Sequence, residues 1–374
     1  MADDYEAVMA AAVGPLLATL DGFEQVQRRL HPPELPALRA AMKPVGQRLA
    51  SGLDGIAAAS PPEALRGFND QLLAGGRSLA EAFDLFCSEA SPEQAIMQVL
   101  ASMGAFTRSL EQLYPLRTFP PLGRFFVEQE FHDRLDELDP EPREGVATGV
   151  HLGGDANDRK ARGGFALYVP EWWDGSAEMP LVVALHGGSG DGRGFMWSWL
   201  REARGRGFFL LAPTAQGSTW SMMGEDIDGP ALRAMVELVA ERWPVKRSSI
   251  LLTGLSDGAT YSLLTGLAED SPFTAIAPMS GVLHPANLER GNMQRAAGRR
   301  IYLVHGALDW MFPVETARWA SGQLREAGAD LVYREIDGLS HTYARDENDR
   351  ILSWFDASLV LPGDGEKNKG GNET

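Results

Sequence analysis

Ser256 is the residue whose surroundings in this sequence most directly predict chemistry. It lies in Gly254-Leu255-Ser256-Asp257-Gly258, between the aliphatic run 250–253 and a helical pattern that begins at 257. A serine on a sharp turn between a strand and a helix presents its hydroxyl as a nucleophile, and flanking glycines let neighbouring backbone approach. The N-terminus of the following helix directs its free amides at a reacting carbonyl. The pentapeptide alone is weak evidence, but in this context it predicts a nucleophile.

A serine hydroxyl needs a base, and the base needs an acid that orients it. Of the seven histidines, only His284, His305 and His341 follow Ser256. For a serine on a nucleophile elbow of this strand-turn-helix kind, the chain order is serine, acid, histidine. Asp309 follows a predicted strand, and His341 is the only histidine beyond it. We therefore predict His341 as the general base and Asp309 as the orienting acid.

Two other interpretations of the acids stay open. Asp337 is closer in sequence to His341 but follows a different predicted strand, which makes it the alternative acid. Asp309 can also be a plain turn residue, because aspartate side chains stabilise turns.

A glycine-rich loop, 186–190, follows the aliphatic run 181–185 and predicts an oxyanion hole. Such a hole combines the amide after the nucleophile with an amide from the loop behind an early strand, here Asp257 and Gly188. Phosphate binding is the alternative, although the loop lacks the lysine and the spacing of a P-loop. Since a carboxylate beside the nucleophile disfavours an oxyanion, we expect the Asp257 side chain to point out of the site.

Apolar side chains fall on loops near the predicted strand ends. We predict Trp220, Trp310 and Met311 as substrate-binding residues that line an apolar acyl pocket. Packing in the core is the alternative for these side chains. The predicted chemistry implies no metal and no organic cofactor.

These residues need a scaffold, and the periodicity after about 163 provides one. Short β-type runs alternate with helical patterns, which predicts an α/β fold with a mostly parallel sheet and helices on both faces. The predicted strands are 165–169, 181–185, 208–212, 250–253, 275–278, 301–304 and 331–336. The predicted helices are 194–205, 230–243, 257–268, 314–328 and 346–358.

The N-terminal part has a different pattern. Residues 1–115 carry the apolar period of four helices, which predicts an all-α helical bundle. Two of the helices are preceded by serine, proline and an acid or amide, at 60–63 and 91–94, as in a capped helix start. Residues 116–163 are predicted as a linker with one helix and the entry to the sheet, 164–361 as the catalytic domain, and 362–374 as a disordered tail.

Composition limits the partners. The formal net charge of −17 disfavours nucleic acid and anionic lipid surfaces. We expect no membrane span, because no stretch approaches the roughly 18 apolar residues that one needs. The acidic start and an apolar run that breaks at Pro15 do not match a secretory signal. With a single cysteine, the chain is predicted to be cytoplasmic.

Five motifs, in order, carry a resemblance to a known family: HGGSGDG, PTAQGSTW, GLSDGA, HGALDWMFPV and DGLSH. Over about 145–360 the chain resembles the serine esterases of the α/β-hydrolase superfamily, in particular phospholipase/carboxylesterase and polyhydroxybutyrate-depolymerase-like esterases. The resemblance implies an α/β-hydrolase fold and a carboxylesterase that forms an acyl-enzyme on Ser256. Asp257 departs from it, since such proteins more often carry a neutral residue there.

Other functions remain as alternatives. A thioesterase, an acyltransferase or a peptidase would use the same residues, and a hydrolase-fold binding protein would use none of them. A small-molecule ester is the expected substrate. Only about twenty residues separate the predicted strands 275–278 and 301–304, too few for a large inserted cap. The helical bundle is therefore either a lid or a module for homodimerisation or partner docking.

Overall fold

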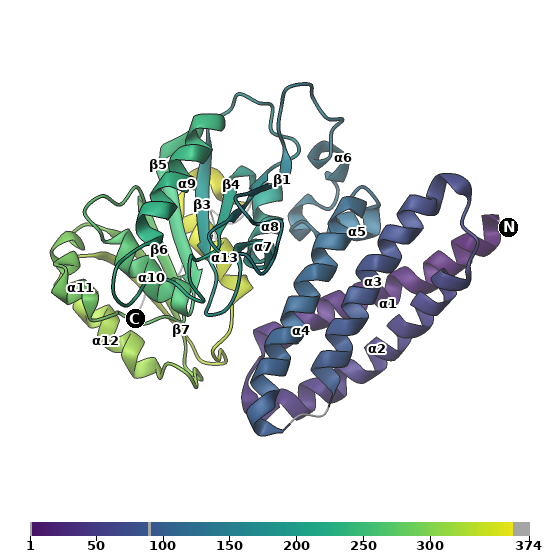
Figure 1. Cartoon of the computed structure of the whole chain (residues 1–374), viewed down its shortest axis with the longest axis horizontal. Helices are drawn as coiled ribbons and strands as arrows, with labels where there is room; N and C mark the ends of the chain where they lie inside the picture. The colour runs from purple at the N-terminus through teal and green to yellow at the C-terminus, as the bar shows by residue number, and fades with distance from the viewer. Residues whose placement is uncertain (1, 89–90, 362–374) are drawn as a thin grey trace. The chain divides into compact units, whose positions relative to one another are not determined.

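The computed structural model describes residues 2–88 and 91–361, and the chain divides into two units, 1–136 and 137–374 (Figure 1). The division falls inside the segment 116–163 that the sequence predicts as a linker. The predicted disordered tail, 362–374, lies outside the described residues.

The first unit contains the predicted helices. Its four long helices are α1 (Ala2–Arg28), α2 (Leu35–Ala58), α3 (Arg66–Cys87) and α4 (Pro92–Leu113), followed by the short α5 (Pro120–Phe125). Aromatic side chains meet in the interior, where the Phe23 ring stacks on Phe106 at 5.1 Å between centroids. Glycine allows close approach of the helices: a Cβ atom on Gly52 would lie 2.9 Å from the Ala12 Cα atom.

Two expectations for this unit were wrong: the break of the apolar run at Pro15 and the two serine caps. The helix α1 continues through Pro15 to Arg28, so the apolar run does not break there. Its residues Tyr5–Arg28 are long and apolar enough to cross a membrane by length and composition, with a mean hydropathy of 1.3, although core helices and signal sequences pass the same test. Neither serine start signal forms a side-chain cap, and the first is followed by a 3-10 turn, so that α3 begins only at Arg66.

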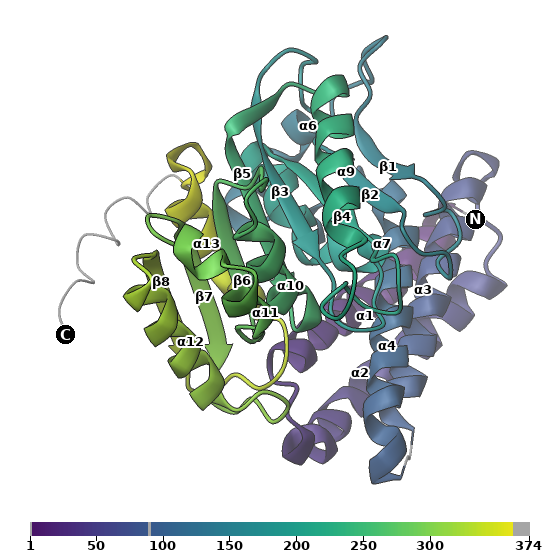
Figure 2. The same cartoon turned by 60° about the vertical axis from the view of Figure 1, so that its left-hand side comes forward.

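The second unit is an eight-stranded sheet in the order β1-β2-β4-β3-β5-β6-β7-β8 (Figure 2). From β4 onward every neighbouring pair is parallel, whereas β2 is antiparallel to both β1 and β4. The mostly parallel sheet of the sequence prediction is confirmed. The strands are β1 (Gly149–Gly153), β2 (Phe165–Val169), β3 (Met179–Leu185), β4 (Phe209–Pro213), β5 (Val245–Leu255), β6 (Ala275–Met279), β7 (Arg300–Gly306) and β8 (Asp330–Ile336).

Helices cover both faces of the sheet, as the alternation along β7 demonstrates. Ile301 and Leu303 point to one face and pack with α12 (Val314–Glu326), in a cluster that includes Leu324. Tyr302, between them, points to the opposite face and contacts Trp354 of α13 (Asn348–Phe355). The helices α9 (Asp228–Arg242) and α10 (Asp257–Gly266) pack on the face of α12.

Two segments differ from the predicted elements. The strand β1 was missed because it is short, lies on the sheet edge and is only partly buried, so it has no aliphatic run. The predicted helix 194–205 is a series of short helical turns: α7 (Gly192–Phe195), a 3-10 turn, α8 (Leu200–Glu202) and a π-helical turn at Ala203–Gly207.

Candidate active site

Ser256 lies between the end of β5 and the start of α10, with φ 56° and ψ −116°. This is a strained conformation for a residue with a side chain. The turn requires both flanking glycines: a Cβ atom on Gly254 would lie 2.6 Å from the Gly258 backbone, and one on Gly258 would lie 2.4 Å from the Leu185 carbonyl oxygen. The Ser256 N–H donates to the Met279 carbonyl of β6 at 3.0 Å. Strand, turn and neighbouring strand thus hold the serine in place.

Strain of this kind gathers at one edge of the sheet. Among the described residues, the non-glycine positions with positive φ are Ser189, Ser256 and Ser280. They follow β3, β5 and β6, all at carboxyl ends of parallel strands. In open α/β sheets this edge is where ligands bind.

His341 comes to Ser256 from the loop after β8. Its Nε2 atom lies 2.9 Å from the Ser256 Oγ atom, and its side chain is 9% exposed. Its Nδ1 atom lies 2.8 Å from Oδ2 of Asp309, a residue of the loop after β7. The three side chains predicted from chain order therefore form one continuous hydrogen-bonded series.

The parallel pairing of β7 with β8 explains why Asp309 and His341 meet. The two strands pair in register up to Gly306 and Ile336, and their loops leave the sheet side by side. The loops are then joined by a hydrogen bond from the Leu308 N–H to the Leu339 carbonyl, at 2.9 Å. Elements that are 30 residues apart in sequence thus place an acid beside a histidine.

The Asp309 carboxylate is fully buried and held from several sides. Its Oδ1 atom accepts hydrogen bonds from the N–H groups of Met311, at 2.9 Å, and Phe312, at 2.8 Å. The alternative acid, Asp337, is exposed, and no hydrogen bond joins it to His341 within the described structure.

His305 is a neighbour of the acid that chain order had set aside. Its Nε2 atom lies 2.8 Å from the Phe312 carbonyl oxygen and 3.4 Å from Oδ2 of Asp309. A carbonyl only accepts hydrogen bonds, so His305 carries its proton on Nε2. The Phe312 ring packs edge-on against the His341 ring, with 5.2 Å between centroids. His305 therefore contacts both the acid and the loop that supports the histidine.

The predicted oxyanion residues also lie close together. A Cβ atom on Gly187 would lie 3.6 Å from the Ser256 Cβ atom, so the loop 186–190 passes directly beside the serine. A Cβ atom on Gly188 would lie 2.7 Å from Oδ2 of Asp257. Only glycine leaves room for this carboxylate at the loop.

The Asp257 side chain does not simply turn away from these groups. Its Oδ2 atom accepts a hydrogen bond from the Thr219 hydroxyl at 2.6 Å and faces Gly188. The carboxylate thus lies between the glycine loop and the loop after β4. Its orientation differs from the expectation because the Thr219 hydroxyl, on the loop after β4, donates a hydrogen bond to it.

His186 supports the glycine loop, a role that the sequence analysis did not assign. It is buried, its Nδ1 atom lies 2.6 Å from the Gly187 carbonyl oxygen, and its Nε2 atom accepts the Ala215 N–H at 3.1 Å. Burial lowers the pKa of His186 to about 4, against an opposing hydrogen bond with the Gly187 backbone. The ring is therefore neutral near pH 7. The His-Gly-Gly sequence after a strand was the available signal.

The three predicted substrate-binding side chains lie in different surroundings. Trp220 is 3% exposed, stacks on Tyr261 and donates from its indole N–H to the His186 carbonyl at 2.8 Å. In this place it supports the glycine loop. Trp310 and Met311 are 42% and 47% exposed, on the loop that also carries Asp309.

A hollow of about 340 Å³ lies near this loop. Its walls come from Val282 and Leu283, after β6, and from Glu315, Thr316 and Trp319 of α12. The Val282 N–H donates to the Thr260 hydroxyl at 3.0 Å, which ties this wall to the first turn of α10. No group of three or more His, Cys, Asp or Glu residues that could hold a metal ion occurs among the residues that the structure describes.

Comparisons with known proteins agree with this architecture. Residues 230–358 match the family model described as phospholipase/carboxylesterase. A probable feruloyl esterase C of Aspergillus terreus is 28% identical over 159 residues, which cover 40% of this chain and 56% of that protein. The chain thus spans about half the length of this curated relative.

Among solved structures, esterase PE8 is 25% identical, with a TM-score of 0.40, over 50% of this chain and 95% of the other. The acetyl xylan esterase of Aspergillus awamori is 17% identical, with a TM-score of 0.43, over 55% and 98% of the two chains. The family match covers β6, β7 and β8 together with the candidate serine, acid and histidine. The C-terminal unit therefore has the mostly parallel sheet of the α/β-hydrolase fold, and its residues 230–358 are similar to the phospholipase/carboxylesterase family.

Proposed function

We propose that this domain hydrolyses carboxylic esters through an acyl-enzyme on Ser256. One observation carries the proposal: the hydrogen-bonded series from the Ser256 Oγ atom to His341, at 2.9 Å, and on to Asp309, at 2.8 Å. This is the arrangement in which an imidazole removes the proton of a serine hydroxyl while a carboxylate holds the imidazole in the required tautomer.

The first half of the reaction forms the acyl-enzyme. The Ser256 oxygen attacks the ester carbonyl while His341 Nε2 takes its proton, and the carbonyl oxygen becomes an oxyanion. The N–H groups of Asp257 and Gly188 stabilise that oxyanion. When the tetrahedral intermediate collapses, the bond to the alcohol breaks and His341 returns the proton to the leaving alkoxide.

The second half releases the acid. A water molecule attacks the acyl carbonyl while His341 accepts one of its protons, and a second oxyanion forms in the same place. Its collapse breaks the bond to the Ser256 oxygen, which regains the proton from His341. Asp309 stays ionised throughout and stabilises the imidazolium that forms twice in the cycle.

Replacement of Ser256 by Ala is the direct test. We expect kcat for p-nitrophenyl esters to fall by about four to six powers of ten. The circular dichroism spectrum should stay unchanged. Normal turnover by a purified Ser256→Ala protein would rule out the mechanism.

The assignment of the acid has a matched pair of variants. Asp309→Asn should lower kcat by about 10⁴-fold, because the amide favours the wrong histidine tautomer. Asp337→Asn, which removes the alternative acid, should leave kcat within about twofold, as an exposed substitution away from the reacting atoms usually does. The reverse order of effects would transfer the role to Asp337.

We propose that the hollow beside the Asp309 loop receives the apolar part of the ester, with Trp310 and Met311 at its approach. A panel of p-nitrophenyl esters from acetate to decanoate, with a feruloyl ester suggested by the name of the Aspergillus terreus relative, measures this preference. Trp319→Ala should raise KM for the longer or aromatic esters and leave acetate unchanged. An equal rise of KM for all esters, acetate included, would show that the hollow does not bind the apolar part of the ester.

Thioesterase, acyltransferase and peptidase activities would use the same residues. Assays with acyl-CoA thioesters and with peptide amides, run beside the ester panel, distinguish these activities from ester hydrolysis.

A hydrolase-fold binding protein would differ from all of these enzymes in its reaction with a serine-directed probe. A fluorophosphonate probe should label the native chain and spare Ser256→Ala, whereas a non-catalytic protein would stay unlabelled.

A further inference from the structure

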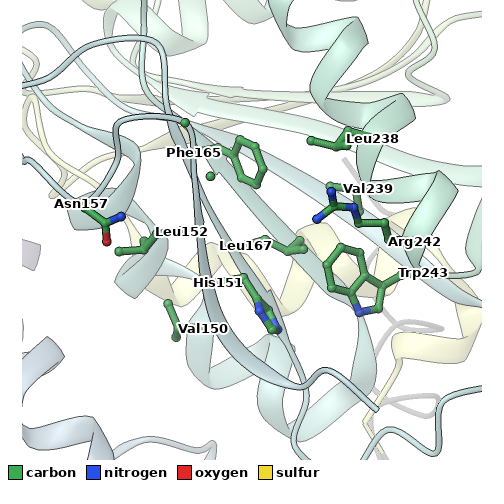
Figure 3. Close-up of a pocket in the computed structure, with 12 residues that line it drawn as sticks. Val150, His151, Leu152, Asn157, Phe165, Leu167, Leu238, Val239, Arg242 and Trp243 are labelled. Carbon is green, nitrogen blue, oxygen red and sulfur yellow. The ribbon is translucent and has the colours of Figure 1, made fainter. Parts of the chain in front are cut away.

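A second cavity, of about 660 Å³, lies at the antiparallel edge of the sheet, away from the proposed catalytic residues. Its walls come from β1, the connection to β2, β2 itself and the C-terminal end of α9 (Figure 3). All of these elements belong to the C-terminal unit. The volume is within the usual range for small-molecule sites.

Seven of the twelve residues that line the cavity have apolar side chains. Phe165 and Leu167 of β2 face Leu238 of α9 and Trp243 across the cavity (Figure 3). The Trp243 side chain is fixed in place, because its indole N–H donates to the Ala147 carbonyl at 3.1 Å and the residue is only 9% exposed. Such walls favour a ligand with an apolar body.

His151 of β1 brings an unsatisfied polar atom to this cavity. Its Nε2 atom is buried and has no hydrogen-bond partner in the described structure. The ring packs against Trp243, with 5.4 Å between ring centroids. A buried polar atom without a partner costs free energy, which a ligand atom recovers by pairing with it.

Arg242 adds a positive charge. In Figure 3 its guanidinium group turns toward the cavity rather than along the axis of α9. Within residues 2–88 and 91–361, no hydrogen bond or ion pair of Arg242 occurs. By contrast, the nearby Arg247 is paired with Glu237. The cavity thus combines an available cation, an unpaired imidazole nitrogen and apolar walls.

We propose that this cavity binds a carboxylate with an apolar body. The planar guanidinium fork of Arg242 matches the two oxygens of a carboxylate, and one cation suffices for one negative charge. The backbone carbonyls of Ala147 and Thr148 hold the proton of the neutral His151 ring on Nδ1; a bound carboxylate favours protonation of the unpaired Nε2 as well, which then donates to a carboxylate oxygen. Phe165 and Trp243 enclose the apolar part of the ligand. The site takes no part in the proposed ester hydrolysis and does not depend on it.

Isothermal titration of the full chain with decanoate tests the proposal. Arg242→Gln should weaken decanoate binding by about tenfold or more, as expected for the loss of a charge-assisted contact. Arg325→Gln, which removes an exposed arginine of α12, is the control for net charge and should bind normally. His151→Phe, which keeps an aromatic ring but loses the nitrogen, should also weaken binding.

Two probes separate the parts of the ligand. Acetate has the charge without the apolar body, and 1-decanol has the body without the charge, so both should bind more weakly than decanoate. Equal decanoate binding by the native chain, Arg242→Gln and His151→Phe would overturn the proposal, and so would equal binding of decanoate and 1-decanol.

Decanoate could also enter the Ser256 site as a product of hydrolysis. The titration is therefore repeated after fluorophosphonate treatment, and the proposal requires that the contribution sensitive to Arg242→Gln persists. If the probe failed to label Ser256, that result would contradict the proposed esterase activity but not the carboxylate site. The effect of Arg242→Gln on decanoate binding is measured in the titration without the probe.

Discussion

At the scale of single residues, the surroundings of His305 carry the first prediction. It is buried, donates to the Phe312 carbonyl and lies 3.4 Å from the Asp309 carboxylate. It therefore acts as a positioning residue for the proposed acid. His305→Leu should lower kcat on the order of 10²-fold, the size of effect that a small misplacement of a catalytic group produces, with KM nearly unchanged.

His305→Gln is the conservative partner of this variant. Its side-chain amide can reach the Phe312 carbonyl and should restore much of the lost kcat. A purely structural role of His305 would instead lower the yield or the melting temperature of both variants, without a selective effect on kcat.

His186 carries the second prediction, on pH and stability. Burial lowers its pKa in the folded state to about 4, whereas the unfolded chain takes up a proton near 6.5. Between these values the unfolded state binds more protons, so the free energy of unfolding falls as the pH falls from 6.5 to 4. The loss amounts to roughly 3 kcal/mol at most.

Urea denaturation of the native chain and of His186→Asn, at several pH values from 7 to 4, measures this effect. The variant cannot take up the proton, so its stability should depend less on pH over that window. Equal slopes for the two proteins would contradict the role of His186. The comparison also reports on the glycine loop, since the same side chain holds the Gly187 carbonyl.

The residue scale also bears on what could be predicted from the sequence. Chain order and strand context were enough to select Ser256, Asp309 and His341, because each follows a strand that its own aliphatic pattern marks. The support given by His186 and His305 was not predictable, because it depends on contacts with the loops around Ala215 and Phe312.

At the scale of elements, the serine turn is a tightly packed junction of the C-terminal unit. A Cβ atom on Gly258 would lie 2.4 Å from the backbone oxygen of Leu185, which cannot move aside without displacing β3. Gly258→Ala should therefore lower esterase activity by at least about 10²-fold, since a shift on the order of 1 Å at a reacting group has that effect.

Gly322→Ala, within α12, is the matched control. No atom lies within 4 Å of its added Cβ, and alanine is the better helix former. This variant should keep full activity and gain up to about 1 kcal/mol of stability. Equal activity of the two alanine variants would show that the turn tolerates a side chain.

At the same scale, the sequence pattern failed at two elements: it missed β1, and it predicted one continuous helix at 194–205. A short edge strand has little apolar alternation, and a run of helical turns has nearly the same apolar spacing as one continuous helix. Packing against the rest of the sheet decides whether such a segment forms a strand, a continuous helix or a series of turns. The cavity lined by β1 was therefore not predictable.

At the scale of the whole molecule, two units with separate hydrophobic interiors predict two unfolding transitions. Covalent labelling of Ser256 should raise the melting temperature of one transition. Gly52→Leu, which would force a side chain against the backbone of Ala12, should lower the other. Differential scanning calorimetry of the full chain measures both.

Gly104→Ala is the control for the bundle, because no atom lies within 4 Å of the added Cβ. It should leave both transitions close to their native temperatures. A single transition that shifts with both the label and Gly52→Leu would instead indicate that the two units unfold together, as a lid bound tightly to the site requires.

The function of the helical bundle stays a prediction, with a lid and a docking or dimerisation module as the alternatives. Deletion of residues 1–136, with the ester panel and the sedimentation coefficient as readouts, distinguishes them once the remaining chain is shown to fold. Altered chain-length preference supports a lid, whereas a changed oligomeric state supports docking. The expected cytoplasmic location is likewise a prediction, and the apolar helix Tyr5–Arg28 is the segment to test in fractionation.

By itself, the sequence predicted a helical N-terminal part, seven of the eight strands of the sheet, and the order of serine, acid and histidine. These features follow from local periodicity and from residues that punctuate single elements. The tertiary structure decided which side chains meet. Asp257 turned to Thr219 and Gly188, Trp220 became buried under the glycine loop, and a cavity that brings His151 and Arg242 together formed beside β1. Such contacts join segments tens of residues apart, and only the order and register of the sheet bring them together.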